Sequence, residues 1–140
     1  MSAEAAREGG SAADAKQAVS QAYHKVAEAV QRCSNEAGLK PPRLVVVTKT
    51  KPVDLLQVVY DEGVRDMGEN YVAELLEKAQ VMPGDIRWRY IGTLQSNKCK
   101  GLIEGVPSLQ CVETIGTAKL ASKLNVRNAP SRHYRNILCP

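Results

Sequence analysis

Short apolar runs alternate with segments of helical pattern four times along this chain, and this alternation restricts the possible fold more than any other feature of the sequence. The apolar runs predict strands at residues 44–47, 64–67, 86–91 and 109–112. Apolar residues at steps of three and four predict helices at residues 53–60, 71–80, 96–104 and 117–124. Because strands joined through helices run parallel with right-handed crossovers, the sequence predicts an α/β fold with a parallel sheet.

A longer amphipathic helix precedes the alternating units. Apolar residues recur at steps of three and four between Ala15 and Cys33, and Gly38 provides a stop signal after them. Ser11 followed by Asp14 gives a capping signal at the start of this segment. The chain is therefore expected to enter the sheet from an N-terminal helix.

Lys49 follows the Val-rich run at 44–47, which has the composition of a strand buried on both faces of a parallel sheet. Strand periodicity puts Val45, Val47 and Lys49 on one face, at the carboxyl end where parallel α/β folds collect their chemistry. Partial burial and the like charge of Lys51 would both disfavour the ammonium form of Lys49. A neutral amine can attack an aldehyde and form a Schiff base. The alternative is that Lys-Thr-Lys-Pro forms a solvated loop.

Composition excludes several classes of protein. The chain has 140 residues, of which 44% are hydrophobic and 24% charged, as in ordinary globular domains. No run approaches the roughly 20 apolar residues of a membrane span, and the net charge of +4 comes without a nucleic-acid-reading motif. The four scattered cysteines and two histidines lack metal-ligand spacing. We therefore expect a cytoplasmic protein with reduced thiols and no metal, nucleic-acid or membrane partner. The acidic residues of its amino end argue against a mitochondrial transit peptide.

Three segments, in this order, resemble the pyridoxal phosphate homeostasis proteins. They are residues 44–52 (LVVVTKTKP), 67–79 (MGENYVAELLEKA) and 88–98 (WRYIGTLQSNK). The resemblance implies a (β/α)₈ barrel similar to the amino-terminal domain of alanine racemase, which holds pyridoxal 5′-phosphate (PLP) as a Schiff base. It implies that Lys49 is the lysine that binds the cofactor.

The same resemblance directs attention to the ends of the next two strands. Asn70, of the Gly-Glu-Asn element, would line the PLP pocket. It could equally serve as the N-cap of the helix that follows. Gly92 and Gln95 follow the third strand. Residues 93–97 either approach the cofactor or shape their own loop, and we favour the second interpretation.

The resemblance stops after Leu124. A complete barrel typically needs ~250 residues, so this chain has length for about four βα units. We therefore expect a disordered tail at 1–11, about the first half of a TIM-type barrel with its leading helix at 12–125, and a divergent, irregular tail at 126–140. The phosphate-binding loops, which the resemblance assigns to the second half of the barrel, would be missing. An open half-barrel is expected to be marginally stable or dependent on another chain.

The function that the resemblance implies is non-enzymatic. The chain would act in intracellular PLP homeostasis by carrying the cofactor on Lys49 and releasing it to apo PLP enzymes. Racemase activity would need a second acid/base group, which alanine racemase takes from a domain that this chain lacks. The alternative is a truncated product whose PLP binding is weak or lost, acting only as an interaction module or not at all.

Overall fold

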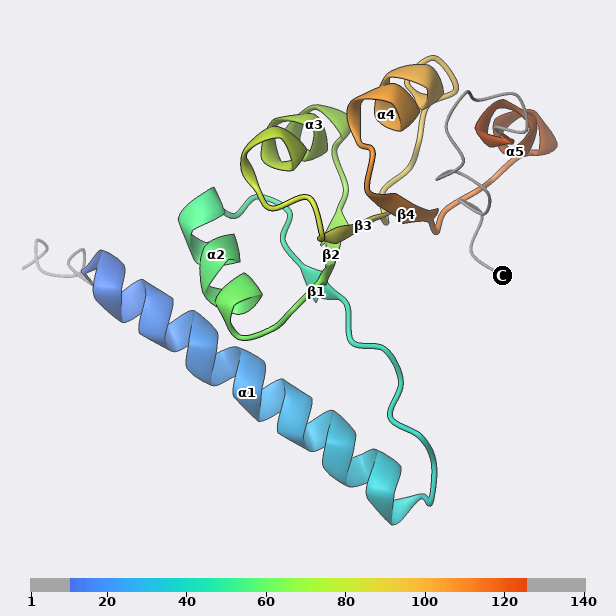
Figure 1. Cartoon of the computed structure of the whole chain (residues 1–140). Helices are drawn as coiled ribbons and strands as arrows, with labels where there is room; N and C mark the ends of the chain where they lie inside the picture. The colour runs from blue at the N-terminus through green and yellow to red at the C-terminus, as the bar shows by residue number, and fades with distance from the viewer. Residues whose placement is uncertain (1–10, 126–140) are drawn as a thin grey trace, which may run out of the picture.

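The computed structural model describes residues 11–125, and within them four parallel strands form one sheet (Figure 1). The strands lie side by side in chain order as β1 (Val46–Val47), β2 (Asp66–Glu69), β3 (Arg87–Tyr90) and β4 (Leu109–Val112). The helices that follow them are α2 (Val53–Asp61), α3 (Val72–Val81), α4 (Cys99–Gly105) and α5 (Ala118–Leu124). These helices form an arc along one face of the sheet (Figure 1). The predicted α/β fold with a parallel sheet is confirmed.

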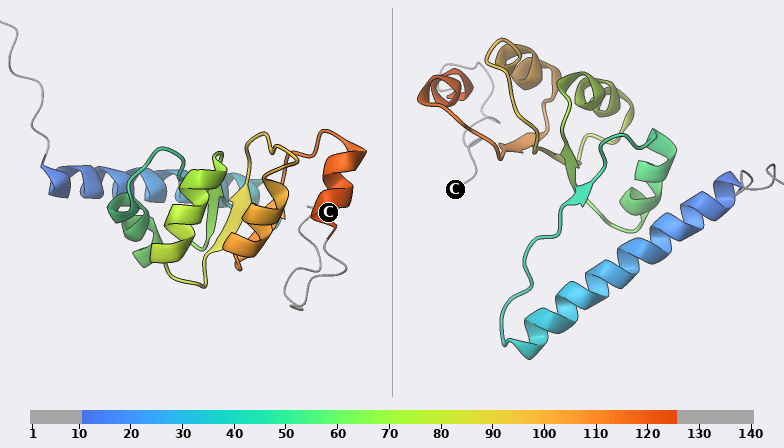
Figure 2. Two further views of the ribbon diagram at one scale, coloured as in Figure 1. Left: turned by 90° about the horizontal axis from the view of Figure 1, so that it is seen from above. Right: turned by 180° about the vertical axis from the view of Figure 1, so that it is seen from behind.

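The leading helix, α1 (Ala12–Glu36), confirms the predicted amphipathic helix and begins at a capping box. Ser11 Oγ accepts from the Asp14 N–H, and the Asp14 carboxylate accepts from the Ser11 N–H. The helix packs against α2, where His24 Nε2 lies 2.6 Å from Glu62 Oε2. Its C-terminal half extends away from the sheet (Figures 1 and 2).

β1 differs most from its prediction. Only Val46 and Val47 belong to it, paired with Met67 and Gly68 of β2, although the apolar run begins at residue 44. In the described part of the chain β1 is an edge strand, so only one neighbour fixes its length. The predicted burial on both faces is wrong, because Val47 is 51% exposed while Val46 packs against the core.

The start of β2 also differs from the prediction, because the connection from α2 takes up two more residues. Gly63 has φ +95°, and the Val64 N–H donates to the carbonyl of Val59 at 3.0 Å, which closes the end of α2. Val64 therefore belongs to the helix ending, and the strand begins only at Asp66. Helix capping has overridden the β-branched character of Val64.

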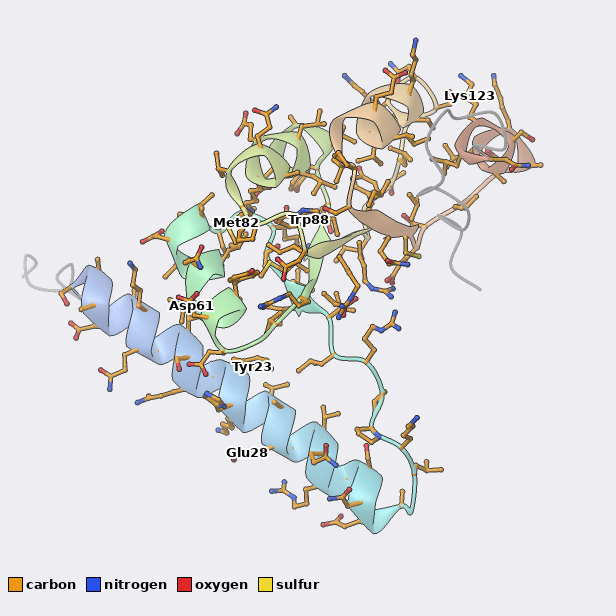
Figure 3. The ribbon with its side chains drawn as sticks, in the orientation of Figure 1. Tyr23, Glu28, Asp61, Met82, Trp88 and Lys123 are labelled. Atoms are coloured by element: carbon orange, nitrogen blue, oxygen red, sulfur yellow. The ribbon has the colours of Figure 1, made fainter. Side chains whose placement is uncertain are left out.

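The hydrophobic core lies between the sheet and the arc of helices. Parallel register aligns Met67, Trp88 and Leu109 on the helix side of the sheet. All three are buried, and Trp88 lies at the centre of the molecule in Figure 3. Leu56, Leu75 and Leu102 meet them from α2, α3 and α4. Each such side chain contributes roughly 1.5–3 kcal/mol by leaving water, which fixes the helices on this face.

The remaining expectations about organisation are only partly tested. A parallel four-stranded sheet with helices on one face is consistent with part of a TIM-type barrel, and the eight-stranded barrel stays a prediction. The tails predicted at 1–11 and 126–140 lie outside the described residues, apart from Ser11. None of the described helices combines the length and the apolar character needed to cross a membrane.

Candidate functional site

The predicted site residues all lie at the carboxyl edge of the sheet. Lys49 is exposed in the turn after β1, so the partial burial expected for it is wrong; Asn70 is half-buried directly after β2, and Gly92 is buried after β3. Because the strands are parallel, their carboxyl ends share one edge, where parallel α/β proteins place their functional residues. The fold therefore brings these three positions to a common edge.

Gly92 brings the loops after β2 and β3 into close approach. A Cβ atom at Gly92 would lie 2.8 Å from the Cα atom of Asn70 and would overlap its carbonyl oxygen. Only glycine allows this backbone contact. On the other side, the Thr114 hydroxyl donates to the carbonyl of Gly92, which ties the end of β4 to the same edge.

The alternative role of Asn70 as a helix cap is wrong. The N-cap of α3 is Tyr71, whose backbone is extended at φ −119° and ψ 125° and whose side chain forms no capping hydrogen bond. The helix thus begins one residue later than the sequence predicts, and Asn70 belongs to the strand end. Whether its amide lines a cofactor pocket stays a prediction.

A buried ion cluster lies beneath the Lys49 turn, on the helix side of the sheet; we call Thr48, Glu69, Glu74 and Lys78 the lysine cluster. Lys78, from α3, is only 5% exposed. Its Nζ donates to Glu69 Oε1 and Glu74 Oε1, both at 2.6 Å, and to the carbonyl of Thr48 at 2.8 Å. The ammonium has three N–H groups, and these three acceptors satisfy them.

The two carboxylates of the lysine cluster hold the turn as well as the ammonium. Glu69 Oε1 accepts from Thr48 Oγ1 at 2.6 Å, and Glu74 Oε1 accepts from the Thr50 N–H at 2.6 Å. Glu69 Oε2 is buried without a hydrogen-bond partner among the described residues. An unpaired buried oxygen of this kind costs about 1–3 kcal/mol, so the cluster is kept at an energetic cost.

Thr50 has the only non-glycine backbone with positive φ among the described residues, at +61°. For a β-branched residue this left-handed conformation costs roughly 1–2 kcal/mol. The Lys51 N–H, which donates to the Thr48 carbonyl at 3.2 Å, helps to hold the tight turn. Backbone strain that surrounding contacts maintain is common at functional sites.

Within residues 11–125, hollows lie along the carboxyl edge. One, of about 520 Å³, lies between the turn and α3 and is lined by Lys51, Glu74 and Glu77 among others, but not by Lys49. Another, of about 450 Å³, lies at the ends of β3 and β4. Its lining combines hydroxyl-bearing residues with apolar ones: Thr93, Ser96, Thr114 and Thr117, with Leu94, Ile115 and Leu120.

The loop after β3 has a turn of its own. The Lys98 N–H donates to the Gln95 carbonyl at 2.9 Å, just before α4 begins. This hydrogen bond supports the interpretation that residues 93–97 shape their loop. Thr93 and Ser96 nevertheless line the hollow at the ends of β3 and β4.

A second ion cluster lies on the opposite face of the sheet; we call Asp66, Arg87, Arg89 and Glu113 the arginine cluster. Arg87 and Arg89 lie 2.6 Å and 3.3 Å from the carboxylate of Asp66, and Arg89 lies 2.7 Å from Glu113. Burial by itself would raise the pKa of Asp66, but hydrogen bonds from Arg87 and Arg89 outweigh it and lower that pKa.

Sequence reasoning missed both clusters. Lys78 lies three residues after Leu75, on the apolar face of α3, and a charged residue there was the available signal. No such signal marks Asp66 or Arg89, because their partners come from other strands. No group of three or more metal-ligating side chains occurs among residues 11–125.

Comparison with known proteins gives a consistent answer. No family model matches the chain. The pyridoxal phosphate homeostasis protein of Bos taurus is 43% identical over 106 residues, which cover 72% of this chain and 38% of that protein. The Caenorhabditis elegans protein of the same name is 51% identical over 82 residues, covering 56% and 33% of the two chains. This chain thus spans well under half the length of the curated relatives that it matches.

Solved structures show the same partial match. An unknown protein from Bifidobacterium adolescentis superposes with a TM-score of 0.67 at 26% identity, covering 77% of this chain and 48% of that one. PipY of Synechococcus elongatus, solved with PLP bound, superposes with a TM-score of 0.53 at 29% identity, covering 69% and 46%. The structural matches, like the sequence matches, therefore cover less than half of the other chain.

Proposed function

Since this chain is a sequence relative of the pyridoxal phosphate homeostasis proteins, we propose that it binds PLP through Lys49 and acts in intracellular PLP homeostasis without catalysing a reaction. The observation that carries the proposal is the position of Lys49, exposed at the carboxyl edge of a parallel sheet. The PLP-bound structure of PipY supports the choice of cofactor.

The residues around Lys49 fit the aldehyde end of the cofactor. When bound, PLP supplies an aldehyde that condenses reversibly with a primary amine and releases water. Lys49 provides that amine, and the fixed turn holds it at the edge that Asn70 also reaches. The hollow on the α3 side contains Glu74 and Glu77, whose carboxylates would repel a phosphate. The proposed site is therefore on the other side of the turn.

The test is a spectrophotometric titration of the 140-residue chain with PLP, followed by borohydride reduction and mass mapping of the modified lysine. We expect a saturable imine absorbance band and labelling at Lys49. Lys49→Ala should abolish the band, whereas Lys51→Ala should retain it. The opposite pattern would overturn the assignment, and scattered labelling of surface lysines would favour a chain that has lost specific PLP binding.

The homeostasis part of the proposal needs a separate experiment. A chain loaded with PLP is mixed with an apo PLP enzyme, and recovery of that enzyme's activity is followed over time. We expect transfer from the loaded chain, since an imine with water access at an exposed lysine is reversible. Lys49→Ala carried through the same loading step is the control and should transfer nothing beyond free PLP. Equal recovery from both chains would contradict a carrier role.

A further inference from the structure

We infer that Glu74 and Lys78 are positioning residues for Lys49: they hold the backbone on both sides of it, so that Lys49 and not Lys51 meets a carbonyl substrate at the carboxyl edge. The inference rests on the proposed function, because it specifies how the binding lysine is selected. It concerns residues of α3 that have no role in the sequence-based prediction of the site.

Hydrogen bonds from its backbone and its side chain fix the residue before Lys49. The Thr48 carbonyl accepts from Lys78 Nζ at 2.8 Å, and the Thr48 hydroxyl donates to Glu69 Oε1 at 2.6 Å. The Thr48 N–H donates to the carbonyl of Gly68 at 2.9 Å. Thr48 is buried on the helix side of the sheet. Since successive residues of an extended chain point to opposite faces, fixing Thr48 directs Lys49 away from α3.

The residue after Lys49 is fixed by α3 as well. The Thr50 N–H donates to Glu74 Oε1 at 2.6 Å, and the same oxygen accepts from Lys78 Nζ. This charge-assisted bond supports the left-handed backbone of Thr50. Without it Thr50 would relax toward the ordinary region of φ, and the turn would change its direction.

The turn separates the two lysines. Lys51 lines the hollow between the turn and α3, beside the carboxylates of Glu74 and Glu77, whereas Lys49 does not. Those carboxylates would repel the phosphate of PLP, so the hollow beside Lys51 is an unfavourable place for the cofactor. Two chemically identical amines two residues apart are thereby placed in different surroundings. The selection depends on the geometry of the turn.

The test compares Glu74→Ala with Glu74→Gln. Alanine removes the acceptor of the Thr50 N–H, while glutamine keeps an oxygen at the same place. Hydrogen exchange at the Thr50 amide should accelerate roughly tenfold or more in Glu74→Ala and much less in Glu74→Gln. In PLP labelling with borohydride, the Lys51 share relative to Lys49 should rise several-fold in Glu74→Ala and stay close to the wild-type value in Glu74→Gln.

The outcomes separate the two proposals. Circular dichroism first establishes that each variant is folded, and Lys100→Ala, in the exposed pair with Glu104, is the matched surface control. A wild-type chain labelled at Lys49 together with an unchanged ratio in a folded Glu74→Ala would overturn the positioning role alone. A wild-type chain that is not labelled at Lys49 would overturn the proposed function and the positioning role with it. A merely structural role of Glu74 would lower stability without changing the labelling ratio.

Discussion

The two faces of β2 carry ion clusters of similar composition in very different surroundings. On the helix side, Lys78 and Glu69 form their pair with side chains that are 6% and 0% exposed. On the opposite face, Asp66 is equally buried, but its partner Arg87 is 49% exposed. The centre of the lysine cluster, Lys78 and Glu69, is therefore enclosed by protein and only Glu74 is partly exposed, whereas the arginine cluster reaches solvent at Arg87.

This difference predicts different energetic roles. A charge enclosed by protein has no water to replace a lost partner. Removing one member of such a cluster therefore leaves an uncompensated buried charge, which lowers the stability of the fold. A charge at a solvated rim loses little, because water solvates whatever remains. Substitution of the enclosed members of the lysine cluster, Lys78 and Glu69, should therefore lower stability strongly, while the partly exposed Glu74 and the arginine cluster should respond more mildly. The strained turn at Thr50 lies over the lysine cluster, which is the more sensitive of the two to substitution.

The largest effect is expected from Lys78→Met, which keeps an unbranched side chain of nearly the same length but removes its charge. Glu69 and Glu74 would remain close together without their shared ammonium. The free energy of unfolding should fall by about 3–5 kcal/mol, measured by urea denaturation; a chain already unfolded without urea also meets the expectation.

The control for that measurement is Lys100→Met. Lys100 pairs with Glu104 at the same helical spacing as Lys78 and Glu74, but its side chain is 84% exposed. The loss should stay below about 0.5 kcal/mol. Equal losses of unfolding free energy in Lys78→Met and Lys100→Met would show that burial does not make the lysine cluster more important for stability than an exposed ion pair.

Gly92→Ala tests whether packing, apart from charge, makes the carboxyl edge rigid. The added methyl would overlap the backbone of Asn70, so a loop must move, and we expect a loss of about 1–3 kcal/mol. Gly101→Ala is the matched control, because it lies within α4 with open space around it. That substitution should be neutral or stabilise by roughly 0.5–1 kcal/mol. A thermal melt that ranks the two variants the other way would contradict the close approach.

Asp66→Asn should have a smaller effect in the arginine cluster. The amide can still accept a hydrogen bond from Arg87 or Arg89, and Arg89 keeps its ion pair with Glu113. We expect a loss of about 1–2 kcal/mol in urea denaturation. A loss as large as that of Lys78→Met would mean that the two faces of β2 do not differ as their exposure indicates.

The pH dependence of stability should show the smallest effect. The pKa of Asp66 is lowered in the folded chain by hydrogen bonds from Arg87 and Arg89 that outweigh the effect of burial. Its contribution is therefore complete above the unfolded value of about 3.9 and is lost as the pH falls through the lower, folded value. Between about pH 5 and pH 2, the free energy of unfolding should fall less steeply with decreasing pH in Asp66→Asn than in the wild-type chain. Identical slopes would contradict the lowered pKa.

Much of the architecture follows from local pattern. The order of strands and helices, the capping box at Ser11 and the position of Lys49 after its strand were all readable from residues close in sequence. The resemblance of three segments to known proteins added the cofactor hypothesis. What failed was the length and double-sided burial of β1, the start of β2 and the capping role of Asn70, because these depend on how each segment meets its neighbours.

The sequence by itself determined the alternation of strands and helices, since apolar periodicity and capping act over a few residues. Only the tertiary structure decided that Lys78 is buried, because its acceptors come from three separate places: its own helix, the end of β2, and Thr48, which is thirty residues away in the chain. An isolated lysine in a helix is ordinarily solvated. Its burial is favourable only when packing of α3 on the sheet brings two carboxylates and a carbonyl to the same ammonium.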